Sequence, residues 1–309
     1  MNVPVDNSLL ASSPSDFCEP HGAGLSAVIA APGSQPPSEN GAAERLEERH
    51  AYETDPWALY YHRKWGDYAV DVAPIIRTFY EATPTGAAER SLIDICCGTG
   101  HLSAIFVEAG YDVLGIDLSD AMIRTANIEQ ADAVSAGRAR FVVGDACAFR
   151  VDRPAGLAVA TYDALNLLPG LPELRDCFAC VAQAVVPGGY FVFDVNTRTG
   201  FREDWTGCLV EESDDDFLFV QGLYDGDRRA TGHYAGFVRD DDGQWLRFEE
   251  NPVGYAFEAG EVIDALLDTG WAEARAVEPK DLSRPLAGDK EPARLHIVAR
   301  RGGGAQEAA

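Results

Sequence analysis

Aspartates and glycines stand where predicted strands end in the first half of the chain, and their spacing indicates a ligand site. The segment Ser91–Leu102 runs from an apolar strand through Asp94, Gly98 and Gly100 into a predicted helix. Glycines at such a bend let the backbone turn sharply and let a ligand approach closely. Asp117 follows Gly98 by nineteen positions. At that spacing an acid reaches the two hydroxyls of an adenosine ribose.

The charge beside this bend favours a cationic ligand over a phosphate. A dinucleotide loop carries a third glycine three positions after the second, and this chain has Ser103 there. Asp94 opposes a pyrophosphate and attracts a sulfonium or an ammonium group. Asp145, after the third predicted strand, can accept a hydrogen bond from an adenine amino group. Each aspartate alone is also explained as a helix or turn cap, but the joint pattern predicts an adenosine site.

The elements that must position these residues alternate strand and helix. This alternation predicts an α/β fold with a buried, mostly parallel sheet. Between Cys208 and Phe257 the pattern changes to strands separated by Asp225-Gly226 and Asp242-Gly243, which are typical hairpin turns, and predicts an antiparallel insertion. The predicted strands are 91–95, 111–117, 140–144, 156–161, 190–194, 274–278 and 295–300. Helices are predicted from 101 and 119 and over 173–185 and 258–267, with a turn at Pro187–Gly189.

Composition limits the partners and the domain organisation. Asp and Glu outnumber Lys and Arg by 50 to 25, so the net charge of -25 disfavours nucleic acid, and no apolar stretch is long enough to span a membrane. Seven cysteines without disulfide or zinc spacing predict reduced thiols and a cytoplasmic location. We expect disordered tails over 1–45 and 302–309 and one domain over 46–301, with the insertion at 208–257.

In this order, the motifs resemble those of the class I S-adenosylmethionine-dependent methyltransferases of small-molecule type. The matching segments are Asp94–Gly100, Gly115–Ser119, Gly144–Ala146 and Val186–Tyr190. The resemblance implies a Rossmann-like, seven-stranded sheet of order 3-2-1-4-5-7-6 with strand 7 antiparallel. It also implies S-adenosyl-L-methionine as cofactor and S-adenosyl-L-homocysteine as product.

By that resemblance, particular residues contact the cofactor. Asp94 and the glycine bend border the methionine moiety, Asp117 holds the ribose, and Leu118 and Met122 pack against the adenine. The full predicted cofactor set is Trp57, Tyr61, Asp94, Cys96, Gly98, Gly100, Asp117, Leu118, Met122, Asp145, Ala146 and Thr161.

The methyl acceptor is predicted to be a small molecule. After strand four the chain lacks the Asn/Asp-Pro-Pro-Tyr motif of nucleic-acid amino-methyltransferases. Its aromatic segment over 46–82 looks like the helical lid of amino-sugar and natural-product N-methyltransferases, with Tyr61 nearest the sulfonium. Tyr162, Asn166 and His233 are candidates to orient or deprotonate the acceptor. An amine and a hydroxyl both stay open as acceptors.

Alternatives remain at this stage. A methyltransferase-like protein could bind the cofactor without transferring its methyl group, in a cyclase or binding role, and an NAD(P)-dependent oxidoreductase is the rival from another class. The 25 basic residues comprise 22 Arg and 3 Lys, a bias that fits bacterial specialised metabolism. The insertion is a candidate homodimer contact. The runs Asp214–Asp216 and Asp240–Asp242 are interpreted as solvated turns, and no metal site is predicted.

Overall fold

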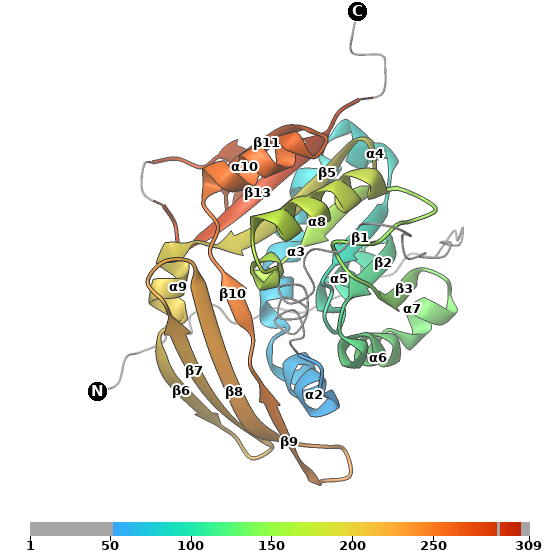
Figure 1. Cartoon of the computed structure of the whole chain (residues 1–309). Helices are drawn as coiled ribbons and strands as arrows, with labels where there is room; N and C mark the ends of the chain where they lie inside the picture. The colour runs from blue at the N-terminus through green and yellow to red at the C-terminus, as the bar shows by residue number, and fades with distance from the viewer. Residues whose placement is uncertain (1–51, 289–290, 304–309) are drawn as a thin grey trace, which may run out of the picture.

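The structure is a computed structural model and describes residues 52–288 and 291–303 (Figure 1). The tail predicted over 1–45, the first residues of the predicted lid and most of the tail predicted over 302–309 lie outside the described residues. In the part of the chain that is described, no helix combines the length and the apolar character needed to cross a bilayer.

The central sheet has the order β12-β11-β13-β5-β4-β1-β2-β3. The strands from β5 to β3 are parallel, and β13 runs antiparallel to both of its neighbours. The predicted order 3-2-1-4-5-7-6 is therefore confirmed. Its strands are β1 (Ser91–Ile95), β2 (Asp112–Asp117), β3 (Ala139–Val143), β4 (Ala155–Ala160), β5 (Val185–Asn196), β11 (Trp271–Glu278) and β13 (Arg294–Arg301).

An eighth strand, β12 (Asp281–Pro285), corrects the predicted count of seven. It pairs only with β11, antiparallel, at the open edge of the sheet. Its short, polar sequence lacks the apolar alternation that predicts a strand, and Pro285 is tolerated because an edge strand needs fewer backbone donors.

Helices cover both faces of this sheet, which explains why its central strands are continuously apolar. One face packs against α3 (Asp67–Glu81), α5 (His101–Glu108) and α6 (Asp120–Glu129), and the other against α8 (Leu171–Ala184) and α10 (Ala259–Asp268). In β1, Leu92 faces the first set of helices and Ile93 the second. The described part also contains four short helices, α4 (Pro84–Ala88), α7 (Ala131–Ser135), α9 (Arg198–Asp204) and η1 (Ala164–Leu167).

The turn predicted at Pro187–Gly189 is wrong, because β5 continues through these residues. Gly188 has φ +78°, and the register between β4 and β5 shifts near Ala155. A side chain at position 189 would lie 2.7 Å from the carbonyl oxygen of Gly156. The glycines thus allow an irregular but unbroken strand to pass close to β4.

A second sheet, of five antiparallel strands, follows β5 and extends away from the central sheet (Figure 1). Its turns contain Gly226 and Gly243, both with φ near +80° to +88°, the region that favours glycine. Side chains alternate between an inner face, turned toward the first described helix, and an outer face. The strands are β6 (Gly207–Glu212), β7 (Asp216–Tyr224), β8 (Arg229–Arg239), β9 (Trp245–Glu250) and β10 (Val253–Tyr255).

The first described helix, α2 (Asp55–Lys64), lies between α6 and strands β8 and β9 (Figure 1). Its start is set by Asp55-Pro56, because proline at the first helical positions loses no hydrogen bond. Glu250 of β9 accepts hydrogen bonds from the backbone N–H groups of Tyr52 and Thr54 and from the Thr54 hydroxyl. Lys64, at the other end, forms a 2.7 Å ion pair with Asp216 of β7. The second sheet therefore holds both ends of this helix.

Candidate active site

The glycine bend after β1 brings backbone close to the carboxyl ends of β1 and β2. Cys96, Gly98 and Gly100 have φ values of 55°, 54° and 83°. The bend is fixed by hydrogen bonds from the Cys97 N–H to the Ile116 carbonyl and from the Gly100 N–H to the Cys97 carbonyl. A side chain at position 100 would lie 3.1 Å from the Phe141 ring, so glycine is needed there.

Asp117 connects this bend to the end of β2. Its Oδ2 accepts a 2.8 Å hydrogen bond from the Gly98 N–H, and its Oδ1 accepts one of 2.9 Å from the Ser119 N–H. Burial raises the pKa of Asp117, and these backbone donors oppose the rise. Each carboxylate oxygen keeps a further lone pair, and the side chain lines a cavity. Asp117 can therefore accept hydrogen bonds from a ligand while it fixes the bend.

Asp94 lies deeper, with 2% of its surface exposed. Its Oδ2 accepts a 2.7 Å hydrogen bond from the hydroxyl of Ser103, the residue that breaks the dinucleotide pattern. Burial raises the pKa of Asp94 to about 7, although the Ser103 hydrogen bond lowers it. Asp94 does not line the main cavity but a smaller adjoining one, of about 30 Å³, which shares Tyr61 and Cys96 with it. A cation placed there would stabilise the charged form of Asp94.

The main cavity has a volume of about 350 Å³, and we divide it into two parts. The cofactor half is lined by the glycine bend and by residues after β2 and β3. It contains nine of the predicted cofactor residues: Tyr61, Cys96, Gly98, Asp117, Leu118, Met122, Asp145, Ala146 and Thr161. Ile116 and Leu168 add apolar surface, and Tyr52 and Trp65 add aromatic surface from the lid side. Such a mixture of apolar walls and few polar groups is typical of small-molecule sites.

Three predicted cofactor residues do not line this cavity. Gly100 supports the bend, and Asp94 lines the smaller cavity. Trp57 is fully buried, with its ring stacked on Tyr60 at 5.7 Å and on Tyr52 at 5.3 Å. It packs between α2 and the second sheet, so the structure does not bring Trp57 to a ligand. Its aromatic character predicted a buried ring but could not tell the core of the lid from its ligand-facing side.

The acceptor half is lined by residues from η1 and its preceding turn, α9, β5, β13 and the second sheet. Its members are Tyr162, Asp163, Ala164, Leu167, Asn196, Asp204, Trp205, Leu209, Glu211, Leu218, Val220, Tyr234 and Arg294. Tyr162 and Asp163 both adopt left-handed backbone conformations, with φ of 65° and 50°. Non-glycine residues adopt this region only where other contacts hold them.

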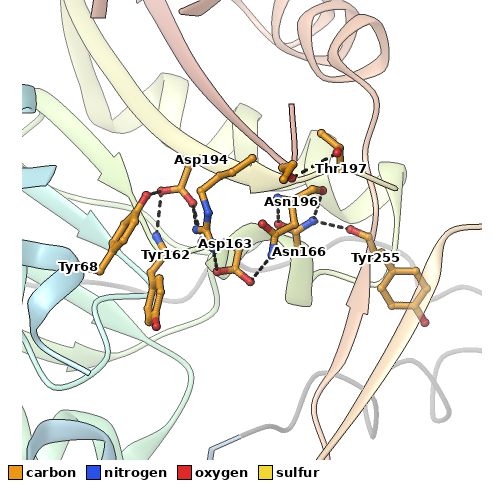
Figure 2. A network of polar contacts seen from close by, with 10 residues as sticks. Tyr68, Tyr162, Asp163, Asn166, Asp194, Asn196, Thr197 and Tyr255 are labelled. Carbon is orange, nitrogen blue, oxygen red and sulfur yellow. Dashed lines mark hydrogen bonds and ion pairs between the residues drawn. The ribbon is translucent and has the colours of Figure 1, made fainter. Parts of the chain in front are cut away.

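Asp194, at the end of β5, holds this turn (Figure 2). Its carboxylate accepts hydrogen bonds from the backbone N–H groups of Tyr162, at 2.9 Å, and Asp163, at 2.7 Å, and from the Tyr68 hydroxyl. The side chain is 1% exposed. This buried charge is compensated by Arg294, whose guanidinium donates to both Asp194 and Asp163 (Figure 2). The strained turn is therefore fixed by one carboxylate and one guanidinium.

The rings of Tyr68 and Tyr162 stack on each other beside this network. They stack at 4.7 Å, and the Arg294 guanidinium lies 5.2 Å and 5.6 Å from their centroids. Burial raises the pKa of Asp163 to about 6, and Arg294 opposes this rise. The 2.8 Å ion pair with Arg294 favours the charged form of Asp163 at the wall of the acceptor half.

The structure brings only one of the three predicted acceptor residues to the cavity. Tyr162 lines it, whereas Asn166 is fully buried. The Asn166 amide donates to the carbonyls of Asn196 and Tyr255 and accepts from the Asn196 N–H, so it bridges β5 and β10 (Figure 2). His233 does not line the cavity and points to the outer face of β8, where it contacts Glu249 at 3.1 Å. Its neighbour Tyr234 lines the cavity instead.

Several residues of the site were missed from sequence. Asp163 lies in the segment after strand four, and Asp194 ends an apolar strand at the same sheet edge. Both therefore show the pattern that identified Asp117 and Asp145, an aspartate at the carboxyl end of a strand. Arg294 is 131 residues from its partner Asp163, and nothing local marks it. Glu250, which holds the lid helix, is still farther in sequence from its partners, at 196 and 198 residues.

Comparison with known proteins adds a family to this geometry. Residues 92–189 match the family described as a methyltransferase domain. The solved structure of the sugar N-methyltransferase KedS8 from Streptoalloteichus has a TM-score of 0.64 at 20% identity, with 89% of this chain and 99% of that chain covered, which shows a common fold. Residues 92–189 therefore match a methyltransferase domain, and the chain around them has the fold of solved S-adenosylmethionine-dependent methyltransferases.

Two curated relatives methylate different kinds of atom, nitrogen and oxygen, according to their names. The dTDP-3-amino-3,4,6-trideoxy-alpha-D-glucopyranose N,N-dimethyltransferase of Streptomyces venezuelae is 30% identical over 141 residues, 45% of this chain and 55% of its own length. The ubiquinone biosynthesis O-methyltransferase of Saccharophagus degradans is 28% identical over 140 residues, 44% of this chain and 58% of its own length. The chain thus covers little more than half of each of these two relatives.

The residues of the cofactor half fit S-adenosyl-L-methionine, the cofactor of this methyltransferase. Asp117 presents a carboxylate for ribose hydroxyls beside the apolar walls formed by Leu118 and Met122. Arg294 is the one basic side chain among the described residues that line the cavity, and it lies in the acceptor half. The cofactor half therefore provides acidic and apolar surface for adenosine and a cation, without the positive charge that favours a pyrophosphate.

Proposed function

We propose that the methyltransferase transfers a methyl group from S-adenosyl-L-methionine to the nitrogen of a small-molecule amine in specialised metabolism. The observation that carries this proposal is the Asp163 carboxylate, which lines the acceptor half and forms a 2.8 Å ion pair with Arg294. A carboxylate attracts an ammonium group and accepts hydrogen bonds from it. The Streptomyces venezuelae relative is an amino-sugar N,N-dimethyltransferase, which is consistent with this choice.

The residues of the chain orient the reactants in this proposal. The cofactor supplies a methyl group already activated by its sulfonium, so catalysis depends mainly on alignment, which contributes roughly 7 to 11 kcal/mol in well-oriented reactions. The Asp163 carboxylate anchors the amine and is itself held by Arg294 and by Asp194 through its backbone N–H. Tyr61 and Trp65 of the lid wall exclude water and present aromatic faces to a cation.

Isotope transfer from labelled S-adenosyl-L-methionine to pooled amines, amino sugars and phenols tests the proposal. We expect label in an amine, with one S-adenosyl-L-homocysteine released per methyl transferred. Asp163→Asn should raise the KM of that amine at least tenfold, since a charge-assisted hydrogen bond contributes about 1.5 to 3 kcal/mol. Asp152→Asn, an exposed change outside the cavity lining, is the control.

The other outcomes of this assay identify the alternatives. Label only in phenols would establish a hydroxyl acceptor, as for the O-methyltransferase of Saccharophagus degradans, and would contradict the proposal of an amine acceptor. Saturable cofactor binding without transfer to any acceptor would favour the cyclase or binding role. Bound or consumed NADH, seen by absorbance, would favour the oxidoreductase.

A homodimer through the second sheet stays a prediction. Val210, Phe237 and Trp245 project from the outer face of that sheet with 58%, 43% and 48% exposure, which supports it, because large exposed apolar groups mark contact surfaces. Light scattering at several concentrations, with Trp245→Glu as the variant, would test it. A monomeric wild-type protein at all concentrations would contradict it.

A further inference from the structure

The charges of the acceptor half select among amines. This step rests on the proposed function. We infer that the acceptor is an amine that enters as a cation without a phosphate group, such as a free or glycoside-linked amino sugar, rather than a nucleotide-activated one. The charges in question face the part of the substrate that lies away from the methylated nitrogen.

The acidic side chains of the acceptor half outnumber its basic ones. Asp163, Asp204 and Glu211 line it, with Arg294 as the one basic side chain among the described lining residues. Arg294 is shared between two carboxylates, those of Asp163 and Asp194, so its positive charge is more than neutralised within its own network. An anion that entered this half would meet net negative charge.

Asp204 and Glu211 are the acids that face the outer part of the substrate. They come from different elements, the end of α9 and strand β6, and converge on the same cavity. Neither has a basic side chain within ion-pair distance among the described residues. Glu211 accepts a 3.4 Å hydrogen bond from the Tyr60 hydroxyl, which leaves most of its capacity open. Both can bind a second ammonium or the hydroxyls of a sugar.

The basic side chains on nearby elements are already engaged. Lys64 of α2 lies 2.7 Å from Asp216, and Arg198 of α9 lies 3.1 Å from Asp227. Arg202, also on α9, is exposed and does not line the cavity. Among the described residues, a diphosphate at the cavity wall would therefore have to break one of these ion pairs, recruit Arg202 from outside the lining, or remain uncompensated beside Asp204 and Glu211.

Aromatic and aliphatic side chains complete the preference for a cationic sugar-like molecule. Tyr162, Trp205 and Tyr234 line the acceptor half together with Leu209 and four further aliphatic residues. Aromatic faces attract ammonium groups and pack against the apolar faces of sugar rings. Their hydroxyl and indole N–H groups can donate to a phosphate, but these side chains carry no positive charge to balance it. The charge and the aromatic surface thus favour the same class of acceptor.

Three matched acceptors test the inference. They are one monoamino sugar as its methyl glycoside, a diamino sugar as its methyl glycoside, and the same monoamino sugar linked to thymidine diphosphate. We expect kcat/KM to be highest for the diamino glycoside and lowest, by about 100-fold or more, for the nucleotide-linked sugar, with differences that shrink at high salt. Equal kcat/KM values, or the highest value for the nucleotide-linked sugar, would overturn the inference.

Charge-removing variants locate the effect. Glu211→Gln and Asp204→Asn should each raise the KM of the diamino glycoside about three- to tenfold with kcat little changed, since they remove attraction and not alignment. Glu212→Gln and Glu203→Gln remove the same charge from neighbouring residues that do not line the cavity, and they should leave KM unchanged. Equal effects of all four variants would refute a local role for Asp204 and Glu211.

Direct binding separates this inference from the proposed function. The Kd values of the same three compounds are measured by calorimetry with S-adenosyl-L-homocysteine present. If no compound is methylated but the diamino glycoside binds tightest, the charge preference stands and the amine methyltransferase proposal fails. If amines are methylated but the nucleotide-linked sugar binds tightest, the function stands and the charge preference fails.

Discussion

The two halves of the cavity are built in different ways, although they share one space. In the cofactor half, Asp117 and the glycine bend are fixed by backbone hydrogen bonds between segments that are adjacent in the sheet. In the acceptor half, a strained turn depends on Asp194 and on Arg294, which comes from the far end of the chain. The cofactor half is thus formed by segments that are adjacent in the sheet, whereas the acceptor half needs residues from distant parts of the chain. Substitutions in the two halves should therefore have different effects.

The largest effect should come from Arg294→Met. This change leaves Asp194, 1% exposed, as an uncompensated buried charge. Removing one partner of a buried ion pair costs about 3 to 5 kcal/mol, so the free energy of unfolding in urea should fall by that amount. Arg300→Met on the same strand breaks a contact with the half-exposed Glu273 and should cost at most about 1 kcal/mol. Equal losses would contradict the structural role of Arg294 in the acceptor half.

Asp117→Ala should give the next largest effect, and mainly on binding. The variant loses the acceptor for the Gly98 and Ser119 N–H groups as well as the ligand for ribose hydroxyls. Two charge-assisted hydrogen bonds correspond to about a 100-fold increase in the Kd of S-adenosyl-L-homocysteine. Calorimetry measures this, with Asp112→Ala at the start of β2 as the control. A Kd within threefold of the wild type would show that Asp117 does not hold the cofactor.

The same difference explains what could be predicted from the sequence. The strand order came from the family resemblance that the short motifs carry. Most of the cofactor half could be predicted from the same motifs, because each motif places its own residues through the bend that it forms. Arg294 and Glu250 could not be found, since their partners lie 131 and up to 198 residues away and no local pattern encodes such pairings. The position of Asn166 after strand four predicts contact with the acceptor, but its amide donates to the backbone carbonyls of Asn196 and Tyr255, which are far away in the sequence.

Asp94→Asn should change binding by about tenfold, in a way that depends on pH. Because burial raises the pKa of Asp94 to about 7, the unliganded wild type loses this negative charge as pH falls below about 7. Because the cofactor is attracted by the charged form of Asp94, S-adenosyl-L-methionine should bind about tenfold more weakly at pH 6 than at pH 8. The variant keeps a side-chain acceptor for the Ser103 hydroxyl but has no charge at position 94. It should therefore bind the cofactor weakly, without the pH dependence that Asp94 gives the wild type over this range.

Stability should change in the opposite sense at this residue. The folded-state pKa of Asp94 lies above the ordinary value of 3.8, so the folded protein loses stability through this group as pH rises from about 4 to 7. Asp94→Asn should therefore raise the free energy of unfolding at pH 8 while it weakens binding. Urea titration of the unliganded protein at pH 5 and pH 8 measures this, and a lower stability of the variant at pH 8 would refute it.

The smallest effect is expected at His233, which the sequence suggested as a base. Alternation along β8 turns His233 to the outer face beside Glu249, while Tyr234 lines the acceptor half. His233→Ala should leave kcat/KM within about twofold of the wild type from pH 6 to pH 9, whereas loss of a general base costs about 10² to 10⁴. Tyr234→Ala should raise the acceptor KM, because the ring borders the site. A large loss at His233 with none at Tyr234 would mean that the second sheet presents its other face to the acceptor.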